Sequence, residues 1–348
     1  MVSRRALVGG AVVVGAASAL SACLPGQSTP SSSPSSSDPS VSEVLPTGKQ
    51  FTISRDSAQA TITEVGATLR TYTVDGLDVL DPFAETQMSD SHGQILIPFP
   101  NRIAKASYQF AGTQEVLPIN QPSDDAAIHG LVRWLPWRPL EQSAESIVMV
   151  NDLFPSPGYP FALRSQATFT LTSTGLEVEY HVTNIGIAKL PLGIGTHPYF
   201  TVGTANIDTA TLTIPAKTML VTNSNGIPTG RQPVNGTEFD FREPKQIGKT
   251  VLDTAYTDLI RDPDGVFRVT LEGPDGKRKV EVELGASDSF VQVYSSDTLP
   301  DPDTYRASLA IEPMTCPANA FNSKDGLIVL QPGESHDSQW SVRPTIRA

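Results

Sequence analysis

The chain of 348 residues contains only two cysteines, Cys23 and Cys316. Cys23 ends an apolar N-terminal segment, so Cys316 is the one thiol in the remainder of the sequence. A single thiol excludes an internal disulfide bond. The roughly 300 residues that follow the N-terminal region must therefore be held together by an apolar core, and a chain of this length is long enough to form one.

Positive charge is also scarce. The sequence has 25 Lys and Arg against 37 Asp and Glu, which gives a formal net charge of −12. A chain of this sign repels phosphate groups, so nucleic acid and a bare anionic membrane are disfavoured as partners. The charge excludes these classes of partner and says little else about function.

The N-terminus has the three-part plan of a bacterial export signal over residues 1–23. Arg4 and Arg5 give a positive start, and an uncharged apolar run follows over 6–20. The run is too short to cross a bilayer on its own. The Leu-Ser-Ala-Cys sequence at 20–23 resembles the lipobox of bacterial lipoproteins, which implies cleavage before Cys23 and lipid attachment to its thiol. An ordinary secretory signal with an incidental cysteine is the alternative.

Serine and proline dominate residues 24–45. Such a segment has no apolar surface to bury, so we expect a disordered, solvated tether. A lipid anchor followed by a tether predicts an exported cell-envelope lipoprotein that is held at the outer face of the membrane. The twin arginine leaves the export route open, because it is also found in signals for proteins that are exported already folded.

The remaining residues, 46–348, lack long segments of helical periodicity and predict one all-β domain. Apolar and polar residues alternate in many short segments, which is typical of half-buried strands. These segments are 51–54, 60–65, 68–72, 107–110, 168–171, 176–182, 211–214, 267–271 and 279–284. Turn dipeptides such as Asp75-Gly76 and Asp275-Gly276 separate them. The pattern favours a sandwich or a barrel.

Polar residues interrupt apolar or glycine-bounded sequence at five places, which we treat as candidate site motifs. The motifs are Asn101-Arg102-Ile103, Ile128-His129-Gly130, His197-Pro198-Tyr199-Phe200, Leu252-Asp253 and Ile311-Glu312-Pro313-Met314-Thr315. Structural explanations stay open for several of them: a surface arginine, a turn histidine, a core histidine and a turn cap. Glu312 is harder to explain in this way, because its apolar neighbours predict burial and an unpaired buried carboxylate is costly. A structural ion pair with Arg102 is its alternative.

His197 and Glu312 are the proton carriers that general acid–base chemistry needs. If they face each other across a pocket, they can move protons on a neutral substrate without a metal or a cofactor. Trp134 and Trp137 have two readings. Tryptophans are most often core residues, but exposed aromatic faces also stack against sugar rings.

Taken together, the five motifs resemble those of the aldose 1-epimerases, the galactose mutarotase-like proteins. The resemblance covers about residues 50–345. It implies a large antiparallel β-sandwich, a monosaccharide substrate and no metal or cofactor. It also implies the activity: interconversion of the α and β anomers of a free hexose by ring opening and re-closure.

The resemblance also implies roles for single residues. Glu312 would be the general base that takes the proton from the anomeric hydroxyl, and His197 the general acid that protonates the ring oxygen. We expect each of the two to stabilise the charged form of the other. The residues that would bind the sugar are Asn101, Arg102, His129, Asp253 and Gln292, and Arg102 would also steady the charge of Glu312.

Two other classes of function stay open. The first is a non-catalytic carbohydrate-binding lipoprotein on the same fold, which would not need both His197 and Glu312. The second is a glycoside hydrolase or lyase, in which Asp253 and Glu312 would supply the two carboxylates that hydrolysis uses. In that case the histidines would lack a task.

Overall fold

The structure is a computed structural model. It describes residues 44–88, 91–299 and 304–347. The predicted export signal, the lipid attachment at Cys23 and all but the end of the predicted tether lie outside the described residues, so they stay predictions. Within the part of the chain that the structure describes, no helix has the length and apolar character needed to cross a membrane.

β-Strands make up nearly all of the regular structure, and every strand pair is antiparallel, which confirms the predicted fold class. The described residues contain one short α-helix, α1 (Ala320–Ser323), and two 3-10 turns, η1 (Pro122–Asp124) and η2 (Ile207–Thr209). The described residues from Val44 onward belong to one compact unit.

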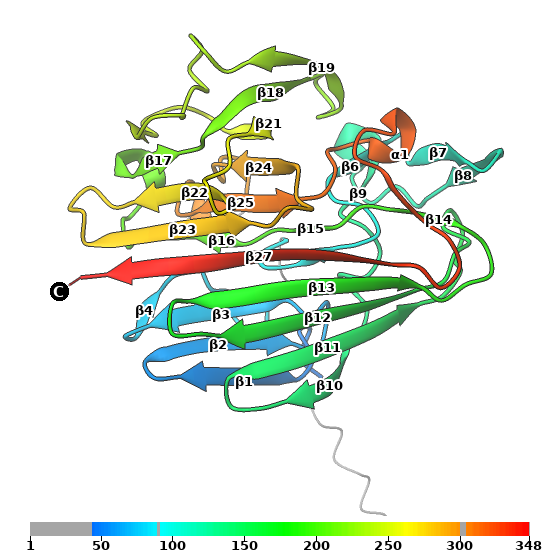
Figure 1. Ribbon diagram of the computed structural model, residues 1–348, viewed down its shortest axis with the longest axis horizontal. Helices are drawn as coiled ribbons and strands as arrows, with labels where there is room; N and C mark the ends of the chain where they lie inside the picture. Colours follow the sequence, from blue (N-terminus) through cyan, green and yellow to red (C-terminus); the bar gives the residue numbers. More distant parts are fainter. Residues whose placement is uncertain (1–43, 89–90, 300–303, 348) are drawn as a thin grey trace, which may run out of the picture. The chain divides into compact units, whose positions relative to one another are not determined.

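The largest sheet has nine strands and supplies one wall of the core (Figure 1). In spatial order these strands are β10 (Arg138–Gln142), β11 (Ser146–Leu153), β12 (Leu163–Leu171), β13 (Leu176–Asn184), β27 (Ser335–Ile346), β23 (Arg278–Leu284), β22 (Phe267–Glu272), β17 (Thr211–Thr213) and β20 (Lys245–Gln246). Burial alternates residue by residue along β12 and β13, as the period-two sequence pattern predicts. One face of this sheet therefore packs inward and the other faces solvent.

A second sheet has eight strands and carries most of the site motifs. Its order is β19 (Pro228–Pro233), β18 (Ala216–Thr222), β21 (Asp253–Leu259), β24 (Phe290–Tyr294), β25 (Leu309–Met314), β15 (Gly195–Thr196) and β5 (Ile95–Leu96), and β16 (Tyr199–Phe200) also pairs with β25. All residues of β25 are buried. A strand covered on both faces shows no alternation, because neither set of side chains meets water.

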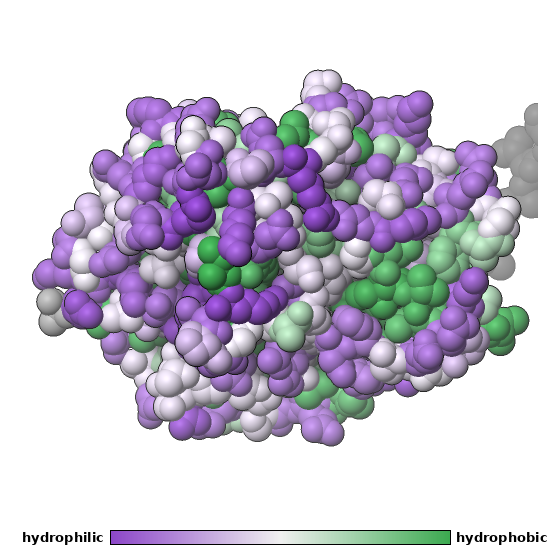
Figure 2. All heavy atoms as spheres, turned by 45° about the horizontal axis from the view of Figure 1, so that its top comes forward, coloured by the Kyte–Doolittle hydropathy of each residue, from purple (hydrophilic) through white to green (hydrophobic). Residues whose placement is uncertain are grey.

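Smaller sheets complete the fold. They are the four-stranded β1 (Gln50–Arg55), β2 (Ala58–Thr63), β3 (Leu69–Val74) and β4 (Leu77–Asp78), and the pairs β14 (Leu190–Leu192) with β26 (Ile328–Leu330), β6 (Arg102–Ala104) with β9 (Ala126–Ile128), and β7 (Ser107–Phe110) with β8 (Thr113–Val116). The face shown in Figure 2 is mostly polar and interrupted by separate apolar patches. This surface agrees with sheets that turn their apolar side chains inward.

Strand register brings the motifs together. Glu312 lies opposite Gln292 in the β24–β25 pair, and Asp253 lies opposite Tyr294 in the β21–β24 pair. Arg102 lies opposite Ile128 in the β6–β9 pair, so the first two motifs are neighbours. Residues more than two hundred positions apart in the sequence thus meet around the inner strands of the eight-stranded sheet.

Candidate active site

One cleft gathers residues from all five motifs. Asn101, Arg102, His129, His197, Asp253 and Glu312 line it, so the structure brings together every predicted site residue of the domain except Gln292. The cleft has a volume of about 350 Å³. Clefts of this size are typical of small-molecule sites.

Glu312 enters the cleft from β25, a buried central strand. Its side chain is only 2% exposed. Hydrogen-bonded neighbours on both sides, β24 and β15, fix the backbone of β25. Glycine is needed at position 195 of β15, which pairs with β25, because a Cβ atom there would lie 2.7 Å from Cβ of Pro100. The carboxyl group is therefore carried by one of the most constrained segments of the fold.

His197 lies between β15 and β16, and its backbone is held from both sides. Its amide donates to the carbonyl of Gln94 at 3.1 Å, and its carbonyl accepts from the amide of Gly93 at 2.9 Å. The ring Nε2 atom lies 3.3 Å from Oε1 of Glu312. This contact places the predicted acid next to the predicted base.

His129 follows β9 in a left-handed backbone conformation, with φ 63°, and Gly130 follows with φ 71°. Gly130 cannot carry a side chain, because a Cβ atom there would lie 2.2 Å from the carbonyl oxygen of Ile97. The His129 amide donates to the carbonyl of Asn101 at 2.9 Å. This tight turn brings the ring edge-on to His197, with centroids 5.2 Å apart at 82°.

Several polar atoms in the cleft are buried without a hydrogen-bond partner among the described residues. They are Oε2 of Glu312, Nδ1 of His197 and Nδ1 of His129. Buried polar atoms are almost always hydrogen-bonded in folded proteins. Three such atoms around one cleft therefore indicate a site built for a polar ligand.

Burial sets the protonation of the acid–base pair. Burial, followed by the charge of His92, lowers the pKa of His197 to about 3. Burial, followed by the charge of Asp253, raises the pKa of Glu312 well above its ordinary value, and Arg102 offsets this only in part. The prediction that the two groups stabilise each other's charged forms is wrong for this structure. Burial, which disfavours the charged form of each group, is the largest cause of both shifts.

The pair nevertheless holds the right number of protons. A neutral histidine beside a protonated carboxyl group holds the same total number of protons as an imidazolium beside a carboxylate. The two arrangements differ only in the position of one proton between atoms 3.3 Å apart. Transfer of that one proton converts one arrangement into the other.

Arg102 and Asn101 lie together at the rim of the cleft. The Arg102 Nε atom donates to Asp124 at 2.7 Å, and Nη1 donates to Oδ1 of Asn101 at 3.1 Å. The ion pair of Arg102 is thus with Asp124, and the close partner of Glu312 is His197. A structural Arg102–Glu312 ion pair therefore does not explain why the glutamate is buried.

Gln292 lies behind the cleft. It lines a small adjoining cavity, together with Leu220 and Thr222 of β18. Its Nε2 atom donates to Oδ1 of Asp253 at 2.5 Å. The structure thus gives Gln292 an orienting contact with Asp253, and the predicted contact with substrate stays a prediction.

Arg133 and Trp134 also line the cleft. Arg133 was not predicted as a site residue, whereas stacking against a sugar was one of the two roles left open for Trp134. Trp134 is 41% exposed, and the guanidinium of Arg133 lies 4.8 Å from its ring centroid. Trp137 is 1% exposed and belongs to the core. The two readings of the tryptophans are therefore divided between them. Arg133 and Trp134 follow the Ile-His-Gly motif closely in the sequence, and this position was the signal that could have identified them as site residues.

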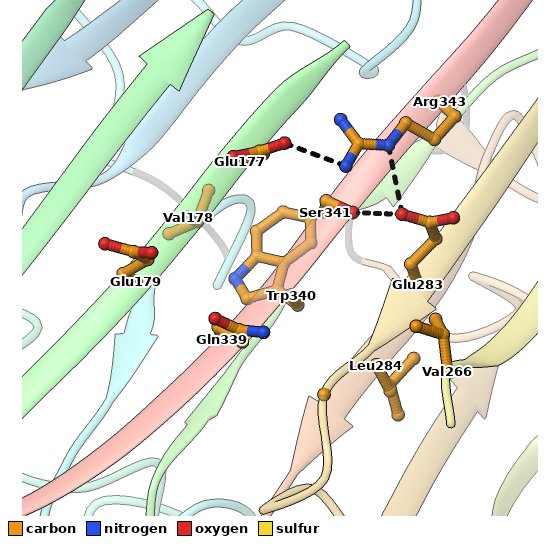
Figure 3. Close-up of a pocket in the computed structure, with 11 residues that line it drawn as sticks. Glu177, Val178, Glu179, Val266, Glu283, Leu284, Gln339, Trp340, Ser341 and Arg343 are labelled. Carbon is orange, nitrogen blue, oxygen red and sulfur yellow. Dashed lines mark hydrogen bonds and ion pairs between the residues drawn. The ribbon is translucent and has the colours of Figure 1, made fainter. Parts of the chain in front are cut away.

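A second pocket lies along the nine-stranded sheet, between β13, β27 and β23 (Figure 3). It has a volume of about 200 Å³. Arg343 pairs there with Glu177 at 2.9 Å and with Glu283 at 3.0 Å, and Ser341 donates to Glu283 at 2.6 Å. These groups satisfy one another, so this pocket is a weaker candidate site. In the ranges 44–88, 91–299 and 304–347, no group of three or more His, Cys, Asp or Glu side chains has an arrangement that could hold a metal ion.

Comparison with known proteins gives the same fold and family. The sequence profile described as "Aldose 1-epimerase" matches residues 49–343. The chain therefore belongs to the aldose 1-epimerase family, and it is a carbohydrate epimerase of the mutarotase type.

Related sequences include YihR of Escherichia coli (strain K12), itself an uncharacterized protein, which is 36% identical over 291 residues. That match covers 83% of this chain and 91% of the relative. Human galactose mutarotase is 30% identical over 231 residues, which is 60% of this chain and 66% of that protein.

Solved structures confirm the galactose mutarotase-like fold. A GalM/aldose epimerase homologue from C. elegans superposes with a TM-score of 0.77 at 20% identity, and the match covers 86% of this chain and 99% of that one. A putative aldose 1-epimerase from Escherichia coli K12 superposes with a TM-score of 0.74 at 22% identity, again over 86% and 99%.

Proposed function

We propose that the protein is a mutarotase that interconverts the α and β anomers of a free hexose. The observation that carries the proposal is the contact between His197 Nε2 and Glu312 Oε1 at 3.3 Å, inside a cleft with unpartnered polar atoms. The two oxygens that exchange protons in mutarotation are both bonded to the anomeric carbon. A donor and an acceptor that lie close together therefore suit the reaction.

Substrate binding changes the protonation states of His197 and Glu312. The sugar hydroxyls donate hydrogen bonds to Glu312 and replace the solvation that burial removed. Hydrogen bonds to a carboxylate favour its charged form. The shared proton then moves from Glu312 to His197, which leaves a base and an acid of the required protonation states.

Ring opening and re-closure then use the pair in opposite directions. Glu312 takes the proton of the anomeric hydroxyl while His197 gives a proton to the ring oxygen, and the bond between the anomeric carbon and that oxygen breaks. The carbonyl group of the open chain turns. The former ring oxygen attacks the other face, returns its proton to His197, and the new anomeric hydroxyl receives a proton from Glu312. No proton is gained or lost over the cycle.

The other cleft residues would bind the sugar. Asp253 accepts hydrogen bonds from hydroxyl groups, and Gln292 fixes its orientation. His129 lines the cleft and would bind the sugar near its ring oxygen. The exposed ring of Trp134 provides an apolar surface for the carbon face of a hexose.

Polarimetry on freshly dissolved α-anomers tests the proposal. Galactose is the first sugar to test, because several relatives are named galactose mutarotases, and glucose and other neutral hexoses follow. We expect the purified protein to speed the approach to anomeric equilibrium above the buffer rate. Binding of a sugar without any acceleration would support the carbohydrate-binding alternative instead. Release of new reducing ends from oligosaccharides would indicate a hydrolase.

We also propose that the protein acts outside the cytoplasm, on a lipid anchor at Cys23. The support is the sequence of residues 1–45. Cell fractionation with labelled palmitate tests it, and we expect Cys23→Ser to abolish the label and to move the protein out of the membrane fraction. Cys316→Ser is the matched control, because that thiol is buried in the domain. Label that survives in Cys23→Ser would contradict the anchor.

A further inference from the structure

A column of stacked rings lies behind His197. The ring of Tyr199 stacks on His197 with centroids 4.9 Å apart at 18°, and on His92 with centroids 3.8 Å apart at 13°. Two rings this close and nearly parallel to Tyr199 cannot share one of its faces. Tyr199 therefore lies between the two histidine rings.

Asp81 anchors the far end of the column. The Nε2 atom of His92 lies 3.4 Å from Oδ2 of Asp81, which also accepts from Ser308 at 2.8 Å. Burial alone would raise the pKa of Asp81, but the hydrogen bonds from His92 and Ser308 outweigh it and the pKa is lowered. Asp81 is therefore an ionised acceptor. Phe83 meets the other side of His92 edge-on, with ring centroids 6.3 Å apart.

The backbone beside His92 holds His197 as well. The two residues that follow His92 bond to His197 in both directions, because Gly93 donates to its carbonyl and Gln94 accepts from its amide. Gln94 also accepts from Arg133 at 3.1 Å, which ties this segment to the cleft wall. A shift of His92 would therefore reach His197 through its ring and through its main chain.

We propose that His92, held by Asp81, is a positioning residue that fixes the ring plane of His197 and places its Nε2 atom at Glu312. This inference rests on the proposed function, because proton exchange with Glu312 is what His197 is positioned for. A phenylalanine would satisfy a purely structural stack. The contact between His92 Nε2 and Asp81 fixes the ring of His92 in the column and is one that phenylalanine cannot make.

The charge of His92 acts against protonation of His197. The pKa of His197 is lowered first by burial and next by His92, and Arg133 adds to the effect. The other titratable groups that face His197 are Glu312, His129 and Tyr199. Removal of His92 should therefore raise the proton affinity of His197, and replacement of its ring should keep the geometry.

Kinetics of three variants separate these effects. We expect His92→Ala to lower kcat about 10-fold with KM within about twofold, because misplacement of a reacting group lowers the rate of the chemical step. His92→Phe should recover most of kcat and shift the acid limb of the pH–rate profile to higher pH. Asp81→Asn should lower kcat as well, because it weakens the contact that holds the ring of His92.

His181→Phe is the matched control. His181 also lies against an aspartate, with Nδ1 2.6 Å from Oδ1 of Asp337, but it is on the exposed face of the nine-stranded sheet. We expect this variant to keep the wild-type kcat and pH profile. If His92→Ala and His92→Phe change kcat and the pH profile no more than His181→Phe does, the inference is wrong. If His92→Ala does not fold, His92→Phe and Asp81→Asn decide.

Histidine ring NMR gives a readout that does not need enzyme activity. The His197 signals can be assigned as those missing from His197→Gln. We expect them to titrate at higher pH in His92→Phe than in the wild type, and to stay unchanged in His181→Phe. A wild-type protein without mutarotation would refute the proposed function, whereas unmoved His197 signals in His92→Phe together with an unchanged kcat in His92→Ala would refute the positioning role by itself.

Discussion

The cleft beside the eight-stranded sheet and the pocket on the nine-stranded sheet differ in how their charged groups are paired. In the pocket, Arg343 is shared between Glu177 and Glu283, and water reaches all three. In the cleft, Glu312 and His197 are 2% and 7% exposed and keep polar atoms without partners. Ion pairs between exposed side chains add little to the stability of the folded protein. Unmet hydrogen bonding in a buried place costs stability and is kept where a ligand can meet it.

The largest expected effect that would test this comparison is that of Glu312→Gln. We expect kcat/KM for mutarotation to fall by at least about 10²-fold, because the general base is lost. Circular dichroism should show an intact fold. An unchanged rate would remove Glu312 from the mechanism.

The same variant should not be less stable at pH 7. Because burial raises the pKa of Glu312, its contribution to stability is present below the unfolded carboxyl pKa and is lost as the pH rises toward the folded value. Glutamine does not titrate and avoids this loss. We expect a melting temperature equal to or above that of the wild type at pH 7, with the two proteins closer at pH 4. A lower melting temperature at pH 7 would show that the carboxyl group is well solvated or paired.

The pH dependence of the wild-type rate is a second test. Burial lowers the pKa of His197 to about 3 and raises the pKa of Glu312, so the form of the pair with one proton persists over a wide range. We expect kcat/KM, after subtraction of the buffer rate, to stay within about twofold from about pH 5 to 8. It should fall in acid when the pair gains a second proton, and in alkali when it loses its only one. A steep change near pH 6.5 would contradict the lowered pKa of His197.

Trp134→Ala should have a smaller effect. Loss of the exposed ring should raise KM about 2- to 10-fold and leave kcat nearly unchanged, because aromatic contacts contribute about 0.5–1.5 kcal/mol beyond their buried area. Trp134→Phe should restore most of the affinity. A large fall in kcat with unchanged KM would place Trp134 in the chemical step and not in binding.

The smallest effect on activity is expected in the other pocket. Arg343→Leu breaks both ion pairs, and we expect mutarotation within about twofold of the wild type and a loss of about 0–1 kcal/mol in unfolding free energy. Urea denaturation and polarimetry measure the two quantities. A substantial loss of activity would mean that the two regions are coupled, and the contrast between them would fail.

Alternation of apolar and polar residues predicted the strands that have one solvent-exposed face. It predicted the other strands less well. Alternation revealed β12, β13, β22 and β23, because each buries every second residue. It did not reveal β27, a twelve-residue strand in the middle of the nine-stranded sheet. Its first half is mostly polar and it contains Pro344, so only pairing with β13 and β23 defines it.

The site divides in a similar way. The motif residues were predicted and the cleft gathers them, whereas the direction of the pKa shifts of His197 and Glu312 was not predicted. Burial controls those shifts, and burial depends on neighbours from many strands. Trp134 and Trp137 show the same limit. Trp137 is fixed inside by bonds from its amide to Glu64 and from its ring to Val132, and Trp134 is left at the cleft.

The full burial of β25 has a consequence for engineering. Glu312 belongs to a fully buried strand and carries the proposed chemistry, so it is best left unchanged. The cleft residues that would contact the sugar away from its anomeric carbon lie at or beyond strand ends. Trp134 precedes β10, Asp253 begins β21, and Thr298 and Leu299 follow β24. Libraries confined to these positions offer a way to redirect the catalyst toward other monosaccharides while its anomeric chemistry stays untouched.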